Sequence, residues 1–243
     1  MNLKEPRDTV ATAAPDGEDI GPERPAVLSS VDRVHDKLRE RILSGDYPPG
    51  SRLVLARLSK EHGVSFIPIR EALQRLEAER LVVIETNRGA RVAEISIADM
   101  RDIYETRVVL EQHAIREAIP RIDEDVLKRA EAALAEMQRY FDSGDEAAAF
   151  AAHQRFHFTL YEPAGSAWTM HVIRQLWASA GRYVRMAASV RPAPAQFVAE
   201  HRAIYDAVAA GDGDLAAERL IDNLRTTERL LTETYERMPH RVS

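Results

Sequence analysis

The fold of the amino-terminal third is decided by four ordered stretches: LRERILSGDYPPGSRL at residues 38–53, GVS at 63–65, PIREAL at 68–73 and NRGA at 87–90. Apolar residues spaced three and four apart lead into the first stretch and predict an amphipathic helix. That helix ends at the glycine and proline cluster within the stretch, because proline cannot continue a helix and glycine favours a helix end. The first stretch therefore predicts one helix followed by a turn.

Two further helices are predicted before residue 80. Residues 56–62 form the first of them, and Gly63 stands where a tight turn between helices needs a residue that tolerates a positive φ. Ser65 is the predicted N-cap of the next helix, residues 66–79, which carries one apolar stripe. The spacing between these helices is typical of a helix-turn-helix unit.

A β-hairpin is predicted directly after the third helix. The runs 81–85 and 90–95 are short and rich in β-branched residues, and residues 86–89 between them contain a glycine that suits a hairpin tip. Three helices followed by a hairpin outline a winged helix-turn-helix, which we assign to residues 29–95.

The rest of the chain is predicted to be helical. Residues 96–238 keep a helical period, broken only by short glycine and proline clusters, so neighbouring helices must run antiparallel. We predict an all-α bundle of six or seven helices, which makes the fold class mainly α. Ser96 and Asp99 resemble a capping box, and Asp123 and Ser143 are predicted N-caps.

Composition limits the class of protein. The chain has 243 residues, a net charge of −6 and no cysteine, which excludes disulfides, thiolate metal sites and a cysteine nucleophile. We expect residues 1–28 to be a disordered tail, because they are rich in proline and lack periodicity, and residues 239–243 to be a short carboxy-terminal tail. The chain contains neither a secretory apolar region nor 18 consecutive apolar residues, so we expect a cytoplasmic protein without a membrane partner.

The third helix has a face suited to a DNA major groove. Arg70 lies opposite the apolar stripe, and its guanidinium fits guanine O6 and N7 or a phosphate. Phe66 and Ile67 fit thymine methyl groups but supply no hydrogen bond. The alternative for Arg70 is a surface ion pair with Glu71 or Glu77.

The hairpin tip is a second candidate for DNA contact. Asn87, Arg88 and Gly89 combine an amide, a cation and a glycine, which suits a minor groove or a phosphate, although ordinary polar turns share this composition. Residues 31–95 contain 12 basic and 10 acidic side chains, so net charge alone does not decide the matter. The helix and the tip together favour DNA binding.

Taken together, the four stretches resemble the DNA-binding domain of GntR-type transcriptional regulators. The resemblance implies that Arg70 and the hairpin tip contact operator DNA. The family commonly has Ser-Arg-Thr-Pro where this chain has SFIP at residues 65–68, so we expect an altered operator preference with binding retained. The predicted DNA-binding residues are Arg52, Ser65, Phe66, Ile67, Arg70, Asn87, Arg88 and Gly89, with Arg57 and Lys60 as further cations.

Two histidines of the predicted bundle suggest a metal site. His153 and His157 are four residues apart, so both imidazoles share one helix face. Roughly 0.26 such pairs are expected by chance from eight histidines, so a structural role is the alternative. His201 and Asn223 lie on two later helices, which an antiparallel bundle can bring to the same cavity.

The second domain resembles the FCD effector domain of the FadR-like GntR subfamily, on the motifs ExRxxxE at 105–111, FH at 156–157 and HRAI at 201–204. The resemblance implies a divalent ion held by an aspartate and three histidines, here at the positions of His153, His157, His201 and Asn223. Histidine replaces the carboxylate and asparagine replaces the last imidazole. The resulting set is neutral, so we expect zinc or nickel with changed occupancy or selectivity.

The same resemblance implies a small carboxylate or sugar acid beside the ion, bound by arginines. The predicted effector-binding residues are Arg107, Arg182 and Arg185. The alternative for Arg107 is an i,i+4 ion pair with Glu111, worth a few tenths of a kcal/mol on a surface.

The predicted function is a homodimeric regulator, usually a repressor in this family, whose affinity for operator DNA is controlled by the effector. We do not expect an enzyme. One rival hypothesis is a metal-dependent helical enzyme that uses His153, His157 and His201, but the sequence lacks a His-Glu-x-x-His motif. Another is an interaction module whose winged helix binds protein. Salt-dependent DNA binding separates the regulator from both.

Overall fold

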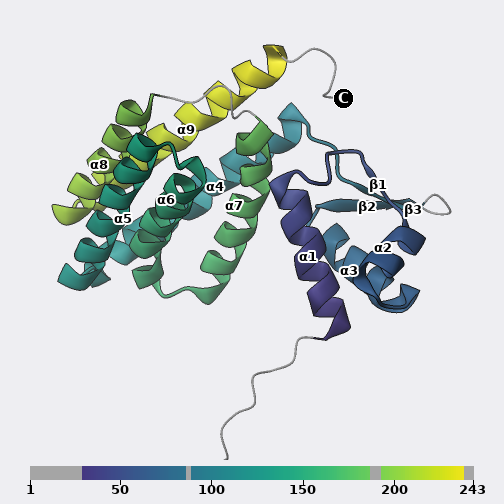
Figure 1. Cartoon of the computed structure of the whole chain (residues 1–243). Helices are drawn as coiled ribbons and strands as arrows, with labels where there is room; N and C mark the ends of the chain where they lie inside the picture. The colour runs from purple at the N-terminus through teal and green to yellow at the C-terminus, as the bar shows by residue number, and fades with distance from the viewer. Residues whose placement is uncertain (1–28, 86–88, 187–192, 238–243) are drawn as a thin grey trace, which may run out of the picture.

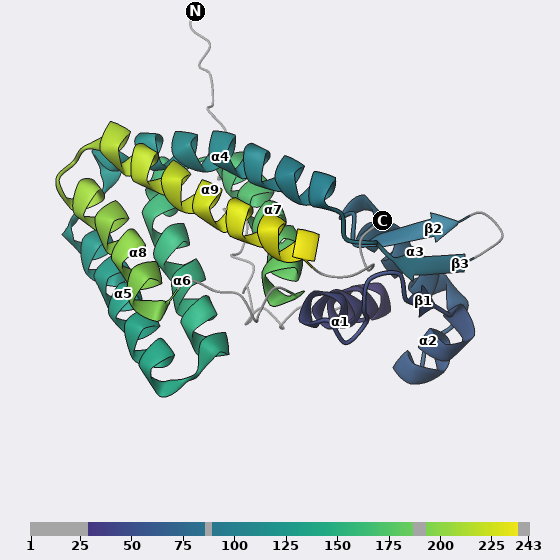
Figure 2. The same cartoon turned by 90° about the horizontal axis from the view of Figure 1, so that it is seen from above.

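The computed structural model describes residues 29–85, 89–186 and 193–237. A small head that contains a β-sheet lies beside a larger helical bundle, as Figures 1 and 2 show from two directions. The fold class is mainly α, as predicted. None of the helices in these ranges is both long and apolar enough to cross a membrane. The predicted tails, residues 1–28 and 239–243, lie outside the described residues.

The head has the predicted winged helix-turn-helix outline together with a short strand that the sequence did not predict. Its sheet is antiparallel, with strand order β1-β3-β2. The unpredicted strand has only two residues and forms because β3 lies beside it, which no local pattern can indicate. The elements are α1 (Ser30–Ser44), β1 (Arg52–Leu53), α2 (Leu55–His62), α3 (Phe66–Ala78), β2 (Val82–Glu85) and β3 (Gly89–Val92).

Helix α1 is defined at both ends by its own residues. Ser29 and Asp32 form a reciprocal capping box, and Gly45 ends the helix in the left-handed region with a φ of 87°. Its apolar face, including Leu38 and Ile42, shares one hydrophobic cluster with the buried stripe of α3. Burial of this stripe leaves the opposite side of α3 facing solvent.

The bundle contains six α-helices within the described residues, in agreement with the prediction. Helices α4 and α9 lie side by side along its length, and α5 packs against α6 and α8 (Figure 2). Two 3₁₀ turns, at Ile119–Arg121 and Glu162–Ala164, mark the proline breaks. The helices are α4 (Ile97–Ala118), α5 (Glu124–Ser143), α6 (Glu146–Tyr161), α7 (Ala167–Met186), α8 (Pro194–Ala209) and α9 (Gly213–Arg237).

Two of the predicted N-caps in the bundle are confirmed and one is wrong. Ser96 accepts a hydrogen bond from the Asp99 N–H at the start of α4, and Asp123 caps α5. Ser143 is instead the last residue of α5. Asp145 caps α6, because Gly144 adopts a positive φ that ends α5 and turns the chain before the next helix can begin.

The head and the bundle have separate hydrophobic cores that meet after β3. Val92 belongs to the cluster of the head, and Ile95 belongs to that of the bundle. Helix α7 holds this junction from the bundle side. Arg182 Nη2 donates to the carbonyl of Ala93, between β3 and α4, at 2.6 Å, and the Tyr183 hydroxyl donates at 2.6 Å to Oδ2 of Asp99 in the first turn of α4. The junction is therefore held by direct polar contacts.

The corrected cap of α6 is testable by substitution. We expect Asp145→Ala to lower the free energy of unfolding by about 0.5–2 kcal/mol, because the Ala148 N–H loses its acceptor. The neighbouring Ser143→Ala should change the free energy by less than about 0.5 kcal/mol, because Ser143 is exposed at a helix end. Urea unfolding followed by circular dichroism measures both; an equal or larger loss for Ser143→Ala would contradict the assignment.

Candidate metal centre and DNA interface

Three predicted metal ligands meet in the bundle. His153 and His157 come from α6 and His201 comes from α8, and their candidate ligand atoms all lie within 4.8 Å of one another. The three ring centroids are 4.7 to 5.0 Å apart. The predicted shared helix face of His153 and His157 meets His201 because α6 and α8 both pack on α5, which brings their side chains together.

The tautomer of His201 is set by a backbone carbonyl. Its Nδ1 lies 2.6 Å from the carbonyl oxygen of Phe197, and a carbonyl can only accept, so Nδ1 carries the proton. The other nitrogen, Nε2, is buried without a hydrogen-bond partner among the described residues. His201 therefore presents an unprotonated Nε2 lone pair to the cluster.

The tautomer of His157 is set through a tyrosine. The Tyr161 hydroxyl donates to Glu111 Oε2 at 2.7 Å, and burial together with this carboxylate raises the pKa of Tyr161 well above its usual value. Because that single proton is used, His157 Nδ1, 3.1 Å from the hydroxyl oxygen, must be the donor of its own bond. The buried Nε2 of His157 is likewise left without a partner in the described part of the chain.

All three imidazoles are held in the neutral form. Burial lowers the pKa of His153 and His157 well below the usual histidine value and lowers the pKa of His201 to about 4. Neutral imidazoles whose other nitrogen is engaged by a carbonyl or hydroxyl are the usual form of histidine ligands to zinc and similar ions. The arrangement is therefore a donor set that fits a divalent transition metal.

The fourth predicted ligand, Asn223, is buried on α9 and has a protein partner. Its Nδ2 donates to Glu200 Oε2 at 2.9 Å, and Glu200 precedes His201 in the chain. The contact ties α9 to the α8 turn that carries the histidine.

Arg107 forms the ion pair that was the alternative to an effector role, but the pair is buried rather than on the surface. Its Nε donates to Glu111 Oε1 at 2.7 Å, and its guanidinium lies 4.4 Å from the Trp177 ring centroid. Trp177 in turn packs against His153 and His157. Arg107 is thus part of the wall beside the histidines.

The other two predicted effector arginines make their contacts at the junction with the head. Arg182 is buried against the Ala93 carbonyl. Arg185 is exposed and lines a groove together with residues of α1, including Asp36 and Leu43.

Sequence reasoning missed the role of Glu111 as the common acceptor of the site. Its side chain is fully buried and accepts hydrogen bonds from Arg107, the Tyr161 hydroxyl and Trp177 Nε1, the last at 2.9 Å. The spacing of Arg107 and Glu111 was visible in the sequence. The donors from α6 and α7 were not, because they come from residues 50 and 66 positions further along the chain.

The candidate DNA face of the head is exposed and free of the predicted competing ion pair. Arg70 makes no ion pair with Glu71 or Glu77, and Glu77 instead accepts from the Ile84 N–H. Ser65 occupies the N-cap position of α3 as predicted but makes no capping hydrogen bond through its side chain. Arg52 is exposed at the edge strand β1.

Gly89 is the residue of the predicted wing tip that lies within the described part of the chain. Gly89 begins β3 with a φ of 90°, which an L side chain rarely adopts, so glycine is required at this end of the hairpin. Asn87 and Arg88 lie outside the described residues.

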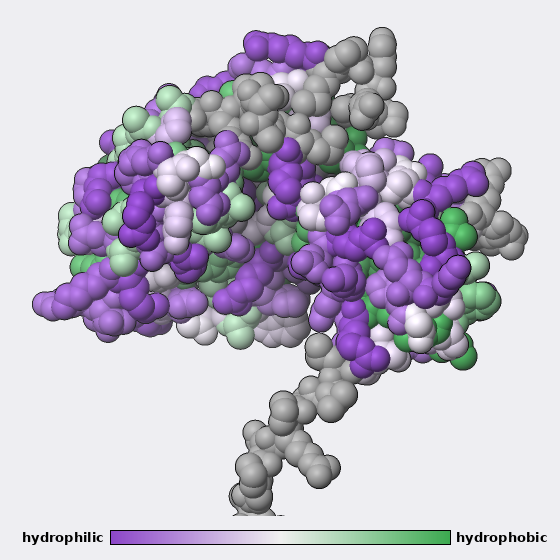
Figure 3. Space-filling view, in the orientation of Figure 1, coloured by the Kyte–Doolittle hydropathy of each residue, from purple (hydrophilic) through white to green (hydrophobic). Residues whose placement is uncertain are grey.

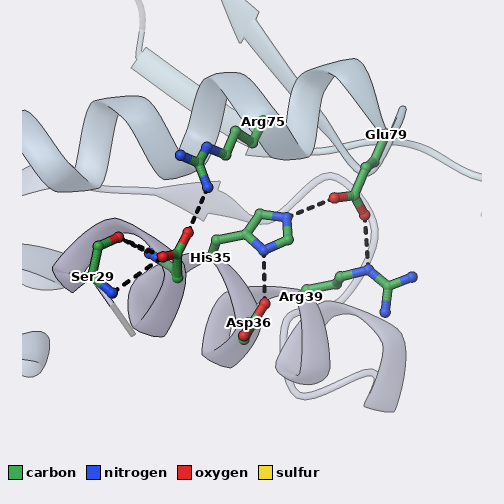
Figure 4. A network of polar contacts seen from close by, with 7 residues as sticks. Ser29, His35, Asp36, Arg39, Arg75 and Glu79 are labelled. Atoms are coloured by element: carbon green, nitrogen blue, oxygen red, sulfur yellow. Dashed lines mark hydrogen bonds and ion pairs between the residues drawn. The ribbon is translucent and has the colours of Figure 1, made fainter. Parts of the chain in front are cut away.

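Helix α3 is held from behind by α1. Figure 4 shows Glu79, at the end of α3, accepting from His35 at 2.6 Å and from Arg39 at 2.8 Å. Arg75 Nη1 reaches Asp32 at 2.7 Å. These contacts brace one flank of α3, whereas Arg70 lies on the other side of the helix.

A winged helix-turn-helix head joined to an all-helical bundle that encloses a buried histidine cluster is the architecture of a two-domain DNA-binding regulator. Two family models match along the chain. Residues 30–92 match the bacterial regulatory proteins of the gntR family, and residues 102–226 match the FCD domain. The chain belongs to the GntR family of transcriptional regulators, with an FCD effector-binding domain, as the sequence motifs predicted.

Known regulators are similar to this chain over much of its length. The HTH-type transcriptional regulator BphR of Paraburkholderia xenovorans (strain LB400) is 31% identical over 80% of this chain and 82% of its own length. The HTH-type transcriptional repressor GlaR of Escherichia coli (strain K12) is 30% identical over 60% of this chain and 68% of its own. A GntR transcriptional regulator from Rhodococcus sp. RHA1 superposes with a TM-score of 0.69 at 27% identity, covering 84% of this chain and 97% of that one.

The tautomers of the cluster are open to direct measurement. In protein stripped of metal, ¹⁵N NMR should show His157 and His201 protonated on Nδ1. Tyr161→Phe removes the acceptor for His157 Nδ1, so His157 should lose this preference while His201, bonded to Phe197, keeps it. Tyr140→Phe on α5 is the control. An Nε2-protonated His201 in the unchanged protein would refute the assignment.

Proposed function

We propose that this regulator is a homodimeric, cytoplasmic repressor whose operator affinity is set by a small carboxylate bound beside a divalent metal in the FCD domain. The observation that carries the metal proposal is the pair of buried, unpartnered Nε2 atoms on His157 and His201. Leaving two such acceptors without hydrogen bonds costs free energy, and a shared cation removes that cost.

The donor chemistry favours zinc or nickel. Imidazole nitrogen suits these ions, whereas calcium and magnesium prefer oxygen ligands. We assign His153, His157 and His201 as ligands and keep Asn223 as the proposed fourth. An ion bound there supplies positive charge and an open coordination position for an anionic ligand.

Charge balance supports a carboxylate effector. Arg107 and Glu111 form an ion pair of opposite charges, and the three imidazoles are neutral, so these side chains have no net charge. The Glu200 carboxylate bonded to Asn223 adds at most one negative charge, so a divalent cation among these groups would still be incompletely balanced in a buried site. A small organic acid provides the missing negative charge, with Arg107 as the nearest basic residue among the three that were predicted.

We propose a binding role for this cluster rather than a catalytic one. Glu111, the buried carboxylate beside the histidines, is already occupied by three donors and so is not a free general base. The relatives are regulators, which gives the helical-enzyme hypothesis no support.

In a dimer, the two DNA-binding heads can adopt different arrangements relative to each other. The effector controls DNA binding if it binds one of these arrangements more tightly than the other. A difference of about 1–3 kcal/mol changes operator affinity roughly 5- to 150-fold. Two copies would place their heads on two half-sites of an operator. We propose repression of transcription rather than activation because GlaR is named a repressor. We propose the cytoplasm as the location because operator DNA lies there.

Elemental analysis tests the metal. Protein purified without an affinity tag should contain about one equivalent of zinc or nickel, and His157→Ala should reduce this at least tenfold. His113→Ala, an exposed histidine on α4, is the control and should keep the metal. Less than a tenth of an equivalent of any transition metal in the unchanged protein would count against the site.

DNA binding tests the head. A preferred duplex is first selected from a random pool, and Arg70→Ala should then weaken its binding at least tenfold, as expected for one good base contact of about 1–3 kcal/mol. Arg101→Ala, an exposed arginine on α4, should leave affinity unchanged. Affinity should also fall steeply with salt. Unchanged affinity of Arg70→Ala would refute the assigned face of α3.

A further inference from the structure

The start of α3 is apolar where it faces solvent. Ile67 is 67% exposed and Phe66 is 49% exposed. Neither can turn into the core of the head, because Ile69, Leu73 and Leu76 already fill the buried side of the helix. Figure 3 shows apolar surface on the head over the region of α2 and the start of α3, within a largely hydrophilic exterior.

These side chains share the outward side of α3 with polar ones. Ile67, Arg70 and Gln74 are spaced at i, i+3 and i+7, so they form one stripe along the helix, opposite the buried one. Ile67 lies one turn before Arg70. A duplex that receives Arg70 in its major groove therefore meets Ile67 at a neighbouring base step.

The same end of α3 favours nucleic acid over an apolar protein partner. The Ser65 side chain makes no capping hydrogen bond, so first-turn N–H groups of α3 remain available, except at Pro68, which has none. Free N–H groups at a helix start attract anions such as phosphate. An apolar partner would leave them without acceptors.

Base chemistry identifies what an apolar side chain recognises in this groove. Among the four bases only thymine offers an apolar group, its C5-methyl, on the major-groove edge. An isoleucine placed against guanine or cytosine would instead bury a polar edge without a hydrogen bond, which is unfavourable. Apolar contact thus selects thymine both by attraction and by rejection of the other bases.

We propose that Ile67, assisted by Phe66, is a specificity-determining residue that reads thymine methyl groups in the operator. The inference rests on the proposed function, since it requires α3 in the major groove. The proposal gives the start of α3, where Phe66 and Ile67 supply no hydrogen bond, a preference for thymine.

Deoxyuridine substitution tests the proposal, because uracil differs from thymine only by the missing methyl group and still pairs with adenine. The full-length protein is titrated with its selected duplex and with duplexes in which each thymine in turn is replaced. One or two positions should lose about fourfold in affinity, as expected for one buried methyl group. Ile67→Ala should bind the thymine duplex more weakly and lose this sensitivity to uracil.

Val109→Ala supplies the matched control, because Val109 is a 60% exposed aliphatic residue on α4, outside the head. It should keep the full uracil effect. If no duplex is selected and binding shows no salt dependence, the proposed function itself fails. If duplexes bind but no thymine is sensitive, or if both Ile67→Ala and Phe66→Ala retain the sensitivity, the methyl-reading proposal is overturned and the regulator assignment stands.

Discussion

The buried carboxylate of Glu111 ties together three helices of the bundle. A charged group with no exposure to water is stable only if its oxygens are fully paired, and here the donors come from α4, α6 and α7. One of these donors, the Tyr161 hydroxyl, uses its only proton on Glu111 and thereby sets the tautomer of His157. The nitrogen that His157 leaves unprotonated, Nε2, therefore depends on Glu111, which acts through the Tyr161 hydroxyl.

Helix α7 connects this constraint to the head. Trp177 donates to Glu111 and packs against two of the histidines. About a turn and a half later, Arg182 holds the segment that leads out of β3 and Tyr183 holds the first turn of α4. One helix therefore contacts both the histidine cluster and the domain junction. Arg182, which the sequence suggested for effector binding, has its place in this junction.

In the head, one flank of α3 is held by contacts with α1, and the opposite flank carries the residues proposed to contact DNA. Ion pairs and hydrogen bonds from α1 fix the flank that carries Arg75 and the end at Glu79. The remaining flank keeps Arg70 without an ion pair in the described part of the chain and leaves Ile67 in solvent. The contacts that hold the helix thus lie away from its outward residues Ile67 and Arg70.

The sequence by itself determined the elements of this protein, because helix periods, caps such as Asp123 and turn glycines act over a few neighbouring residues. It also placed His153 and His157 on one face and ordered the motifs that identify the family. Tertiary structure alone decided the β1 pairing, the burial of the Arg107 pair and the tautomer of His157, which Glu111 sets through Tyr161. These features depend on groups brought together by packing, often from distant parts of the chain, and no local pattern records which atoms will then face each other.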